Sequence, residues 1–413
     1  MSIHADLRHV IYALSEALDL VGVDDVGHGK RVGIMAAECA RAKGLDEEKV
    51  TFLFDLGMLH DIGVSSTGVH AHLVKEFDWL GSQDHCETGY ARLSGFAPLA
   101  HMALPVKYHH TRWDQLQTLQ VSPEVAWQAN LILLVDRVDA LTAPYYADNS
   151  VLLHREDIRE QVRLRAGTYF APELVELFLN VSQREAFWLL LEPRSIQRVL
   201  QDRLAQGLAY QATMGELRPL AEIFARIVDA KSAFTVEHSL GVAGVARFLA
   251  ERMGVGAENC DKIEIAGLLH DLGKLRVPDE ILDKPGKLDP DERLVINTHS
   301  FETYQILRHI QGFEELANWA AWHHEEPDGS GYPFHLKSVD MPLEARILRV
   351  ADIFQAMAQD RPYRPGLDAA ALRGFFAEMV AANRVDAQIV ALLMTELDAA
   401  LQVARSPQRR LAA

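Results

Sequence analysis

Residues 263–274 read IEIAGLLHDLGK, with apolar side chains at the three- and four-residue steps of a helix that ends near Gly273. The stretch VAGVARFLAERMGV has the same periodicity, and segments that alternate at period two are scarce. Proline and glycine collect around 279–291 and 325–341, where we expect long loops. The pattern predicts an all-α protein.

The His-Asp pair of this stretch belongs to an internal repeat, in which MLHDIG parallels LLHDLG. The spacings agree, because His28 to His60 and His238 to His270 both span 32 residues. A shared register of this kind marks repeated structural units, so we predict two tandem helical bundles. The predicted limits are 1–195 for the first domain, 196–229 for connecting helices and 230–413 for the second domain.

The composition argues against several classes of protein. The 413 residues are 49% hydrophobic and carry a formal charge of −17, which argues against broad binding to DNA or RNA. Three cysteines, none in a CxxC pair, fit a reducing compartment and argue against a thiolate zinc site. The N-terminus reads as an amphipathic helix and no apolar run is long enough to span a membrane. We therefore expect a cytoplasmic protein.

The second copy carries a set of residue types that bind metals. The set is His238, His270, Asp271, His299, His323, His324 and Asp352. Ten of the 18 histidines fall on the register that the two copies share, which unrelated core or surface histidines would not do. Imidazole and carboxylate ligands without thiolate suit iron, manganese, zinc or nickel. Two such ions about 3.5–4 Å apart can share a hydroxide and support an in-line phosphoryl displacement.

One lysine follows the same pair. Lys274 lies four residues after His270 and three after Asp271, and on a helix these offsets share a face. Its ammonium would then lie beside the metals, where it could hold a phosphate oxygen or stabilise developing charge. A solvated surface lysine is the alternative for this residue taken by itself.

Several segments, in order and with appropriate gaps, resemble the HD-GYP domains, a branch of the HD phosphohydrolase superfamily. They are HDLGK at 270–274, ILDKPGKLDPDERLVINTHS at 281–300, HHEEPDGSGYP at 323–333 and RVADIFQAMAQDRPYR at 349–364. The resemblance implies a bacterial phosphodiesterase in second-messenger signalling. Its substrate would be cyclic di-GMP or the mixed guanine–adenine ring, 3′,3′-cGAMP, and its product a linear 5′-phosphorylated dinucleotide.

The resemblance also implies roles for individual residues. The seven His and Asp residues above would bind two divalent metals, iron or manganese first and nickel or zinc as alternatives. Asp271 and Lys274 would serve catalysis, with Lys274 on the scissile phosphate. Arg361 and Arg364 would contact the cyclic dinucleotide, which suits a guanidinium fork. Residues 329–333, GSGYP, form what we call the GYP loop. Gly331 permits a tight turn in this loop, and Tyr332 would pack against the loop or a base.

One departure from the family bears on the number of metals. Members that bind three metals use a Glu four residues before the first ligand histidine, and Phe234 stands there in this chain. Phenylalanine cannot ligate, so we predict two metals in the second copy.

The first copy keeps the metal-binding residues and their spacing but lacks the lysine and the GYP loop. Its residues are His28, His60, Asp61, His85, His109, His110 and Asp136. Asp24 precedes His28 by four residues, so a third metal is conceivable there. Val64 stands where Lys274 would be, and TRWDQL replaces the GYP loop. This half resembles the wider HD superfamily only.

Three roles are open for the first copy: a phosphomonoesterase acting on the linear product, a metal-binding regulatory domain, or a structural dimerisation partner. Retention of all seven residues argues against the last, because burying His and Asp without a metal is costly. For the whole chain, the alternative to the phosphodiesterase is a catalytically weak cyclic-dinucleotide sensor. A third possibility is a nucleotide monophosphatase in which the first copy is the main enzyme. The joining helices would suit a homodimer, and the GYP loop would permit contacts with signalling proteins.

Overall fold

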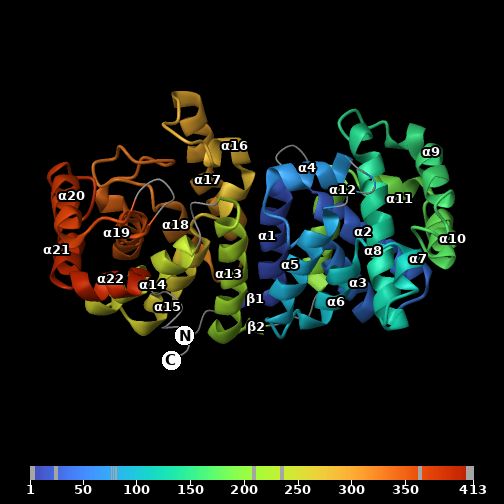
Figure 1. Cartoon of the computed structure of the whole chain (residues 1–413), viewed down its shortest axis with the longest axis horizontal. Coiled ribbons are helices and arrows are strands. Elements are labelled where there is room, and N and C mark those ends of the chain that lie inside the picture. Colours follow the sequence, from blue (N-terminus) through green and yellow to red (C-terminus); the bar gives the residue numbers. More distant parts are fainter. Residues whose placement is uncertain are drawn as a thin grey trace. The chain divides into compact units, whose positions relative to one another are not determined.

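A computed structural model describes residues 5–22, 27–75, 77, 79, 81–206, 211–232, 237–360 and 365–405. The described chain is helical apart from one short antiparallel pairing and two isolated bridges, which confirms the all-α prediction (Figure 1). It divides into two compact units. One is Leu18–Leu208, and the other joins Met1–Ala17 to Ala209–Ala413.

The short pairing explains why the first residues belong to the second unit. Strand β1 (Ala5–Asp6) pairs antiparallel with β2 (Gln211–Ala212), directly before α13 (Met214–Asp229). The division therefore differs from the predicted limits of 1–195, 196–229 and 230–413, because residues 1–17 belong to the second unit and the predicted connecting segment is divided between the units after Leu208. Helix α1 (Leu7–Asp19) runs from this pairing to the start of the other unit.

The unit Leu18–Leu208 is built around α2 and α8. Its helices are α2 (His28–Ala42), α3 (Glu47–Leu59), α4 (Thr67–Lys75), α5 (Ser82–Ser94), α6 (Ala103–Tyr108), α7 (Trp113–Leu116), α8 (Pro123–Thr142), α9 (Val151–Arg163), α10 (Pro172–Val181), α11 (Glu185–Leu189) and α12 (Pro193–Gln206), with 3₁₀ turns η1 (Leu20–Gly22), η2 (Ala100–Met102) and η3 (Ala143–Tyr145). Helix α2 packs against α3 and α8, and α8 is buried on most of its surface. This core carries several of the predicted ligand residues.

The second unit repeats the arrangement around α14. Its further helices are α14 (His238–Arg252), α15 (Ala257–Leu269), α16 (Asp279–Leu282), α17 (Pro290–Leu307), α18 (Glu314–Ala321), α19 (Leu343–Ala358), α20 (Ala369–Ala381), α21 (Ala387–Thr395) and α22 (Leu397–Arg405), with 3₁₀ turns η4 (Leu272–Arg276) and η5 (Ser338–Asp340). Helix α14 packs against α15, α19 and α22. Among the described residues no single helix has the length and apolarity to cross a membrane, and α21 with α22 passes that test only as a pair bent by 86°.

The repeat extends to the helices that precede α2 and α14. Asp19 ends α1, and its carboxylate accepts the Gly29 backbone N–H at 2.9 Å. Asp229 ends α13, and its carboxylate accepts the Ser239 backbone N–H at 3.1 Å. Both bonds satisfy a free N–H in the first turn of a helix, so they fix where the ligand-bearing helices begin.

Capping also sets the start of α17. The Asp289 carboxylate accepts the Glu292 N–H at 2.9 Å, and the Glu292 carboxylate accepts the Asp289 N–H at 2.9 Å. This is a capping box, and Pro290 follows at the first helical position, where its missing N–H costs no hydrogen bond. The helix that starts here carries His299 into the core.

Close helix crossings bring the two ligand-bearing helices of each unit together. A Cβ atom on Gly57 of α3 would lie 2.6 Å from Gly33 Cα of α2. On Gly267 of α15 it would lie 2.8 Å from Ala243 Cα of α14. Backbone atoms meet directly at both crossings, so larger side chains there would separate the helices.

Replacing Gly57 with Ala should therefore destabilise the protein by about 1–3 kcal/mol, since the added methyl meets backbone that cannot move aside. Chemical denaturation followed by circular dichroism measures the change. Gly374→Ala is the matched control, because its Cβ meets nothing within 4 Å. That change should stabilise α20 by up to about 1 kcal/mol. An equal effect of both substitutions would contradict the close-crossing argument.

Candidate metal centres

The structure brings together the seven His and Asp residues predicted in the second unit. His238 begins α14, His270 and Asp271 follow α15, His299 lies on α17, His323 and His324 follow α18, and Asp352 lies on α19. One ligand atom from each residue lies within 4.8 Å of the others in three overlapping groups. The groups are His238, His270 and Asp352; His270, Asp271 and His323; and His299, His323 and His324.

Asp271 lies between these groups. Its Oδ1 atom is 3.4 Å from His299 Nε2 and 3.8 Å from His323 Nε2. Its Oδ2 atom is 3.2 Å from His270 Nε2 and 2.5 Å from Lys274 Nζ. The two oxygens of one carboxylate thus face different histidines.

The buried polar atoms of this cluster fit a bound cation. His270 Nε2 and Asp271 Oδ1 have no hydrogen-bond partner in the described part of the chain, although both are buried. A buried acceptor without a donor is costly, and a metal ion would satisfy both atoms.

Backbone carbonyls orient the histidines toward the centre. In each case the Nδ1 atom contacts the carbonyl oxygen of the residue three positions earlier: His270 to Gly267 at 2.8 Å, His299 to Ile296 at 2.6 Å and His323 to Ala320 at 2.6 Å. A carbonyl only accepts, so Nδ1 carries a proton in each of them, and Nε2 faces the other residues of the cluster. Metal-binding histidines are commonly held in this way.

The protonation of three histidines in the cluster also suits metal binding, whereas Asp271 and Asp352 raise the pKa of His270 against the effect of burial. Burial lowers the pKa of His299 to about 4 and lowers the pKa values of His323 and His324 well below the usual value. These imidazoles are therefore neutral at pH 7, as ligands must be. Burial acts to raise the pKa of Asp271, but the charges of His270 and Lys274 hold that pKa well below its usual range.

The GYP loop packs against the backbone that carries the paired histidines. A Cβ atom on Gly331 would lie 2.5 Å from the His324 carbonyl oxygen, so only glycine fits. The Tyr332 N–H donates to that oxygen at 3.2 Å, and the Tyr332 ring lies 4.8 Å from the His324 ring. Gly331 and Tyr332 thus lie beside the cluster, whereas Arg361, Arg364 and Phe234 are outside the described residues.

Two acidic residues that the sequence motifs did not single out hold this loop. Glu325 is fully buried and accepts the N–H groups of Phe334 at 2.6 Å and Leu336 at 2.8 Å. Glu326 accepts the hydroxyl of Ser330 in the loop at 3.0 Å, and it forms a buried ion pair with Arg349 at 2.8 Å. The sequence signal was present in HHEEPDG, where two acidic residues directly follow the paired histidines.

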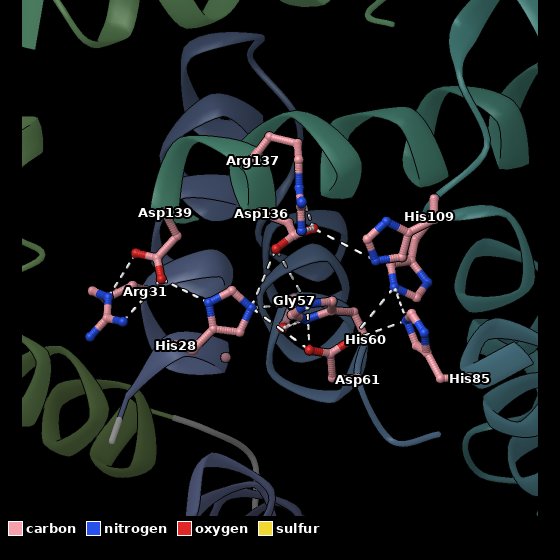
Figure 2. A network of polar contacts seen from close by, with 12 residues as sticks. His28, Arg31, Gly57, His60, Asp61, His85, His109, Asp136, Arg137 and Asp139 are labelled. Carbon is pink, nitrogen blue, oxygen red and sulfur yellow. Dashed lines mark hydrogen bonds and ion pairs between the residues drawn. The ribbon is translucent and has the colours of Figure 1, made fainter. Parts of the chain in front are cut away.

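The first unit brings together its own seven residues, all of which Figure 2 labels except His110. Its groups are His28, His60 and Asp61, and then Asp61, His85, His109 and His110. Asp61 belongs to both groups, as Asp271 lies between the groups of the other unit, and its Oδ1 atom has no hydrogen-bond partner among the described residues. Asp136 Oδ1 lies 3.4 Å from His28 Nε2. Asp24 is outside the described residues.

Figure 2 also shows contacts that the sequence analysis missed. His28 Nδ1 lies 2.7 Å from Asp139 Oδ2, and Arg31 Nε donates to Asp139 Oδ1 at 2.7 Å. Arg137 donates to Asp136 Oδ2 at 2.9 Å. Asp139 follows Asp136 by one helical turn, so the spacing in LVDRVDAL was a usable signal.

The turn after the His-Asp pair has the same backbone in both units. The Val64 N–H donates to the Asp61 carbonyl at 2.8 Å, and the Lys274 N–H donates to the Asp271 carbonyl at 2.8 Å. Val64 therefore occupies the position of Lys274 without its charge. It lines a pocket over the first cluster together with His70, a further residue that the sequence analysis missed.

Comparison with known proteins agrees with this geometry. Residues 222–389 match the HD domain family. The 3′3′-cGAMP-specific phosphodiesterase 1 of Vibrio cholerae is 36% identical to this chain over 412 residues, which are 98% of this chain and 95% of that protein. This chain belongs to the HD-GYP family. The HD-GYP protein is also 41% identical over 142 residues to the cyclic di-GMP phosphodiesterase response regulator RpfG of Xanthomonas campestris, covering 34% of this chain and 38% of that one.

A solved structure supports the fold of this HD-GYP protein along its length. A cyclic GMP-AMP-specific phosphodiesterase of Vibrio cholerae superposes with a TM-score of 0.63 and 24% identity, over 98% of each chain. The prediction of tandem HD-superfamily bundles is thus confirmed.

Glu325→Gln should loosen the GYP loop. An amide offers one acceptor oxygen where the carboxylate offers two, so a buried N–H loses its partner at a cost of about 1–3 kcal/mol. Chemical denaturation measures the loss. Glu314→Gln is the control, because Glu314 also accepts a backbone N–H, from Gly312 at 3.1 Å, but on the exposed surface. Equal stability of the two variants would show that Glu325 does not hold the loop.

Proposed function

We propose that the HD-GYP unit is a metal-dependent phosphodiesterase that opens cyclic di-GMP, 3′,3′-cGAMP or both to a linear 5′-phosphorylated dinucleotide. The observation that carries this proposal is the Asp271 carboxylate, which lies between two groups of histidines and contacts the Lys274 ammonium at 2.5 Å. The relatives named above, which cleave cyclic GMP-AMP or cyclic di-GMP by their names, support the substrate class.

We propose two metals, iron or manganese, in this cluster. His238, His270 and Asp352 would hold one, and His299, His323 and His324 the other, with Asp271 shared between them. When bound, two such ions lower the pKa of a water molecule and stabilise the charge that develops on phosphoryl oxygens. The unsatisfied His270 Nε2 and Asp271 Oδ1 atoms support this assignment.

The chain's own residues would orient the substrate. Lys274 is partly exposed, so its ammonium can reach a phosphate oxygen at the mouth of the cluster while staying near Asp271. Burial raises the pKa of the Tyr332 phenol above its usual value, so the hydroxyl stays protonated and can donate a hydrogen bond. Arg361 and Arg364 remain proposed contacts to the cyclic dinucleotide.

We also propose that the first unit is a phosphomonoesterase that acts on the linear product. Its cluster retains the metal-binding residue types, and its pocket is lined by Val64 rather than by a lysine. The missing ammonium argues against the same diester chemistry, while the metal-binding residues suit hydrolysis of a terminal phosphate. A cytoplasmic location, a homodimer and signalling partners remain predictions.

Asp271→Ala should abolish ring opening and lower the metal content, because the shared carboxylate is lost. Lys274→Met should lower kcat by about 10²–10³-fold while metal is retained, since one charged donor to the reacting phosphate is removed. Chromatography of products from both cyclic dinucleotides, with manganese- or iron-loaded protein, measures turnover, and elemental analysis measures metal.

Lys262→Met is the matched control for Lys274, because Lys262 pairs with Glu258 and Glu315 on the surface of α15. It should keep full activity. Near-normal turnover by Asp271→Ala would refute the assignment of the site. Binding and release of intact cyclic dinucleotide by the wild-type protein would identify a sensor instead of an enzyme.

His60→Ala should separate the two activities, because His60 belongs only to the first cluster. Ring opening should continue at the wild-type rate, while the linear 5′-phosphorylated dinucleotide accumulates. The same chromatographic assay measures both steps. His101→Ala, which changes an exposed histidine of the same unit, is the control. Dephosphorylation of the linear product at an unchanged rate in His60→Ala would exclude the first cluster from this reaction.

A further inference from the structure

The two clusters differ in what holds their first histidine. In the first unit, Nδ1 of His28 lies 2.7 Å from Asp139 Oδ2, and both side chains are buried. The carboxylate can only accept here, so Nδ1 donates, and Nε2 faces His60 Nε2 at 3.3 Å and Asp136 Oδ1 at 3.4 Å (Figure 2). A carboxylate behind a ligand histidine fixes its orientation and makes it a stronger ligand.

Asp139 is itself held by several donors. Arg31 donates from Nε to Oδ1 at 2.7 Å and from Nη2 to Oδ2 at 3.0 Å. The Tyr146 hydroxyl donates to Oδ1 at 2.6 Å, and the Arg31 guanidinium lies 4.3 Å from the Tyr146 ring centroid. A bidentate Arg–carboxylate pair is rigid, so the orientation of His28 is set before any metal arrives.

The described residues of the second unit provide no equivalent of this support. Gly241 stands at the position of Arg31, and Gln355 stands at the position of Asp139. The Gln355 amide donates to the Ala404 carbonyl at 3.2 Å, and Nδ1 of His238 has no hydrogen-bond partner among the described residues. His238 is therefore less constrained than His28.

A second difference concerns the shared carboxylate. The Lys274 ammonium lies 2.5 Å from Asp271 Oδ2 and would repel a cation bound there, whereas the first unit has Val64 at that position. Arg137 is a cation near the first cluster, but it binds Asp136 Oδ2 and leaves Oδ1 facing His28 and His60.

Formal charge alone does not separate the clusters. The first has three carboxylates and two guanidiniums, Asp61, Asp136 and Asp139 against Arg31 and Arg137, and the second has two carboxylates and one ammonium, Asp271 and Asp352 against Lys274. Both therefore carry the same net charge. The difference lies in preorganisation and in where the cation sits.

We infer that the first unit holds the tighter metal site of this chain, and that Asp139 is the positioning residue responsible. The inference rests on the proposed function in one respect, namely that both clusters bind metal. It predicts that metal leaves the two units at different rates, with the first unit retaining its metal longer.

The test is metal release from the full-length, manganese-loaded protein. The protein is mixed with excess EDTA, desalted after set times and analysed for manganese by mass spectrometry. Wild-type protein should lose manganese in a fast and a slow phase. The slow phase should be absent from His60→Ala and present in Asp271→Ala.

Asp139→Asn tests the positioning residue. It should speed up the slow phase by about 10–100-fold, the usual effect of removing a carboxylate behind a ligand histidine. Tyr146→Phe is the matched control, because it removes one bond to Asp139 and keeps the carboxylate on His28. It should leave the slow phase intact. Melting of each metal-free variant, followed by circular dichroism, shows whether Asp139→Asn folds.

Each outcome decides the inference. A single phase, a slow phase that disappears in Asp271→Ala, or wild-type release from folded Asp139→Asn would overturn it. If Asp139→Asn does not fold, the assignment of the two phases in the wild-type protein still decides which site is tighter. Manganese bound in the second unit alone would instead show that the proposed function of the first unit fails.

Discussion

A buried carboxylate surrounded by imidazoles is the constraint on which each unit depends. Asp271 is buried and Asp61 is largely shielded from water, and desolvation acts against the charge of both. Neighbouring histidines keep the pKa values of both carboxyls low, with the help of Lys274 at Asp271, so the charge persists in the folded protein. Buried charge of this kind is expensive unless it is paired or coordinated. The surrounding helices place histidines around this carboxylate, where they can pair with it or bind a metal together with it.

The ends of helices orient the ligand histidines. His60 and His270 each terminate a helix, where the last carbonyl oxygens have no partner within the helix. Each histidine uses such a carbonyl, three residues earlier, to hold its Nδ1–H at 2.7 and 2.8 Å respectively. The same bond satisfies the helix end and aims Nε2 at the centre. Close crossings at Gly57 and Gly267 then bring these ends against α2 and α14.

The two units show how one ligand register can be retained while its surroundings diverge. The second unit has Lys274 and a GYP loop held by Glu325, features that suit recognition of a phosphodiester ring. The first has Val64 and the buried Asp139–Arg31 pair, features that enclose and orient the cluster. A relative that matches 98% of the chain shows that the chain belongs to the HD-GYP family. The family motifs, however, occur only in the second unit, where they include Lys274 and the GYP loop.

The sequence alone predicted the helical class, the tandem repeat and the candidate ligands, because helical periodicity and a repeated 32-residue spacing can be read directly from the order of residues. Local pattern could not place Ala5 and Asp6 with the second unit, since their pairing joins residues about two hundred positions apart. Nor could it assign Asp139 to His28 or Glu325 to the GYP loop. The position of an acidic residue in the sequence does not indicate which side chain it will contact. Only the packing of α2 against α8 brings His28 and Asp139 to a distance of 2.7 Å.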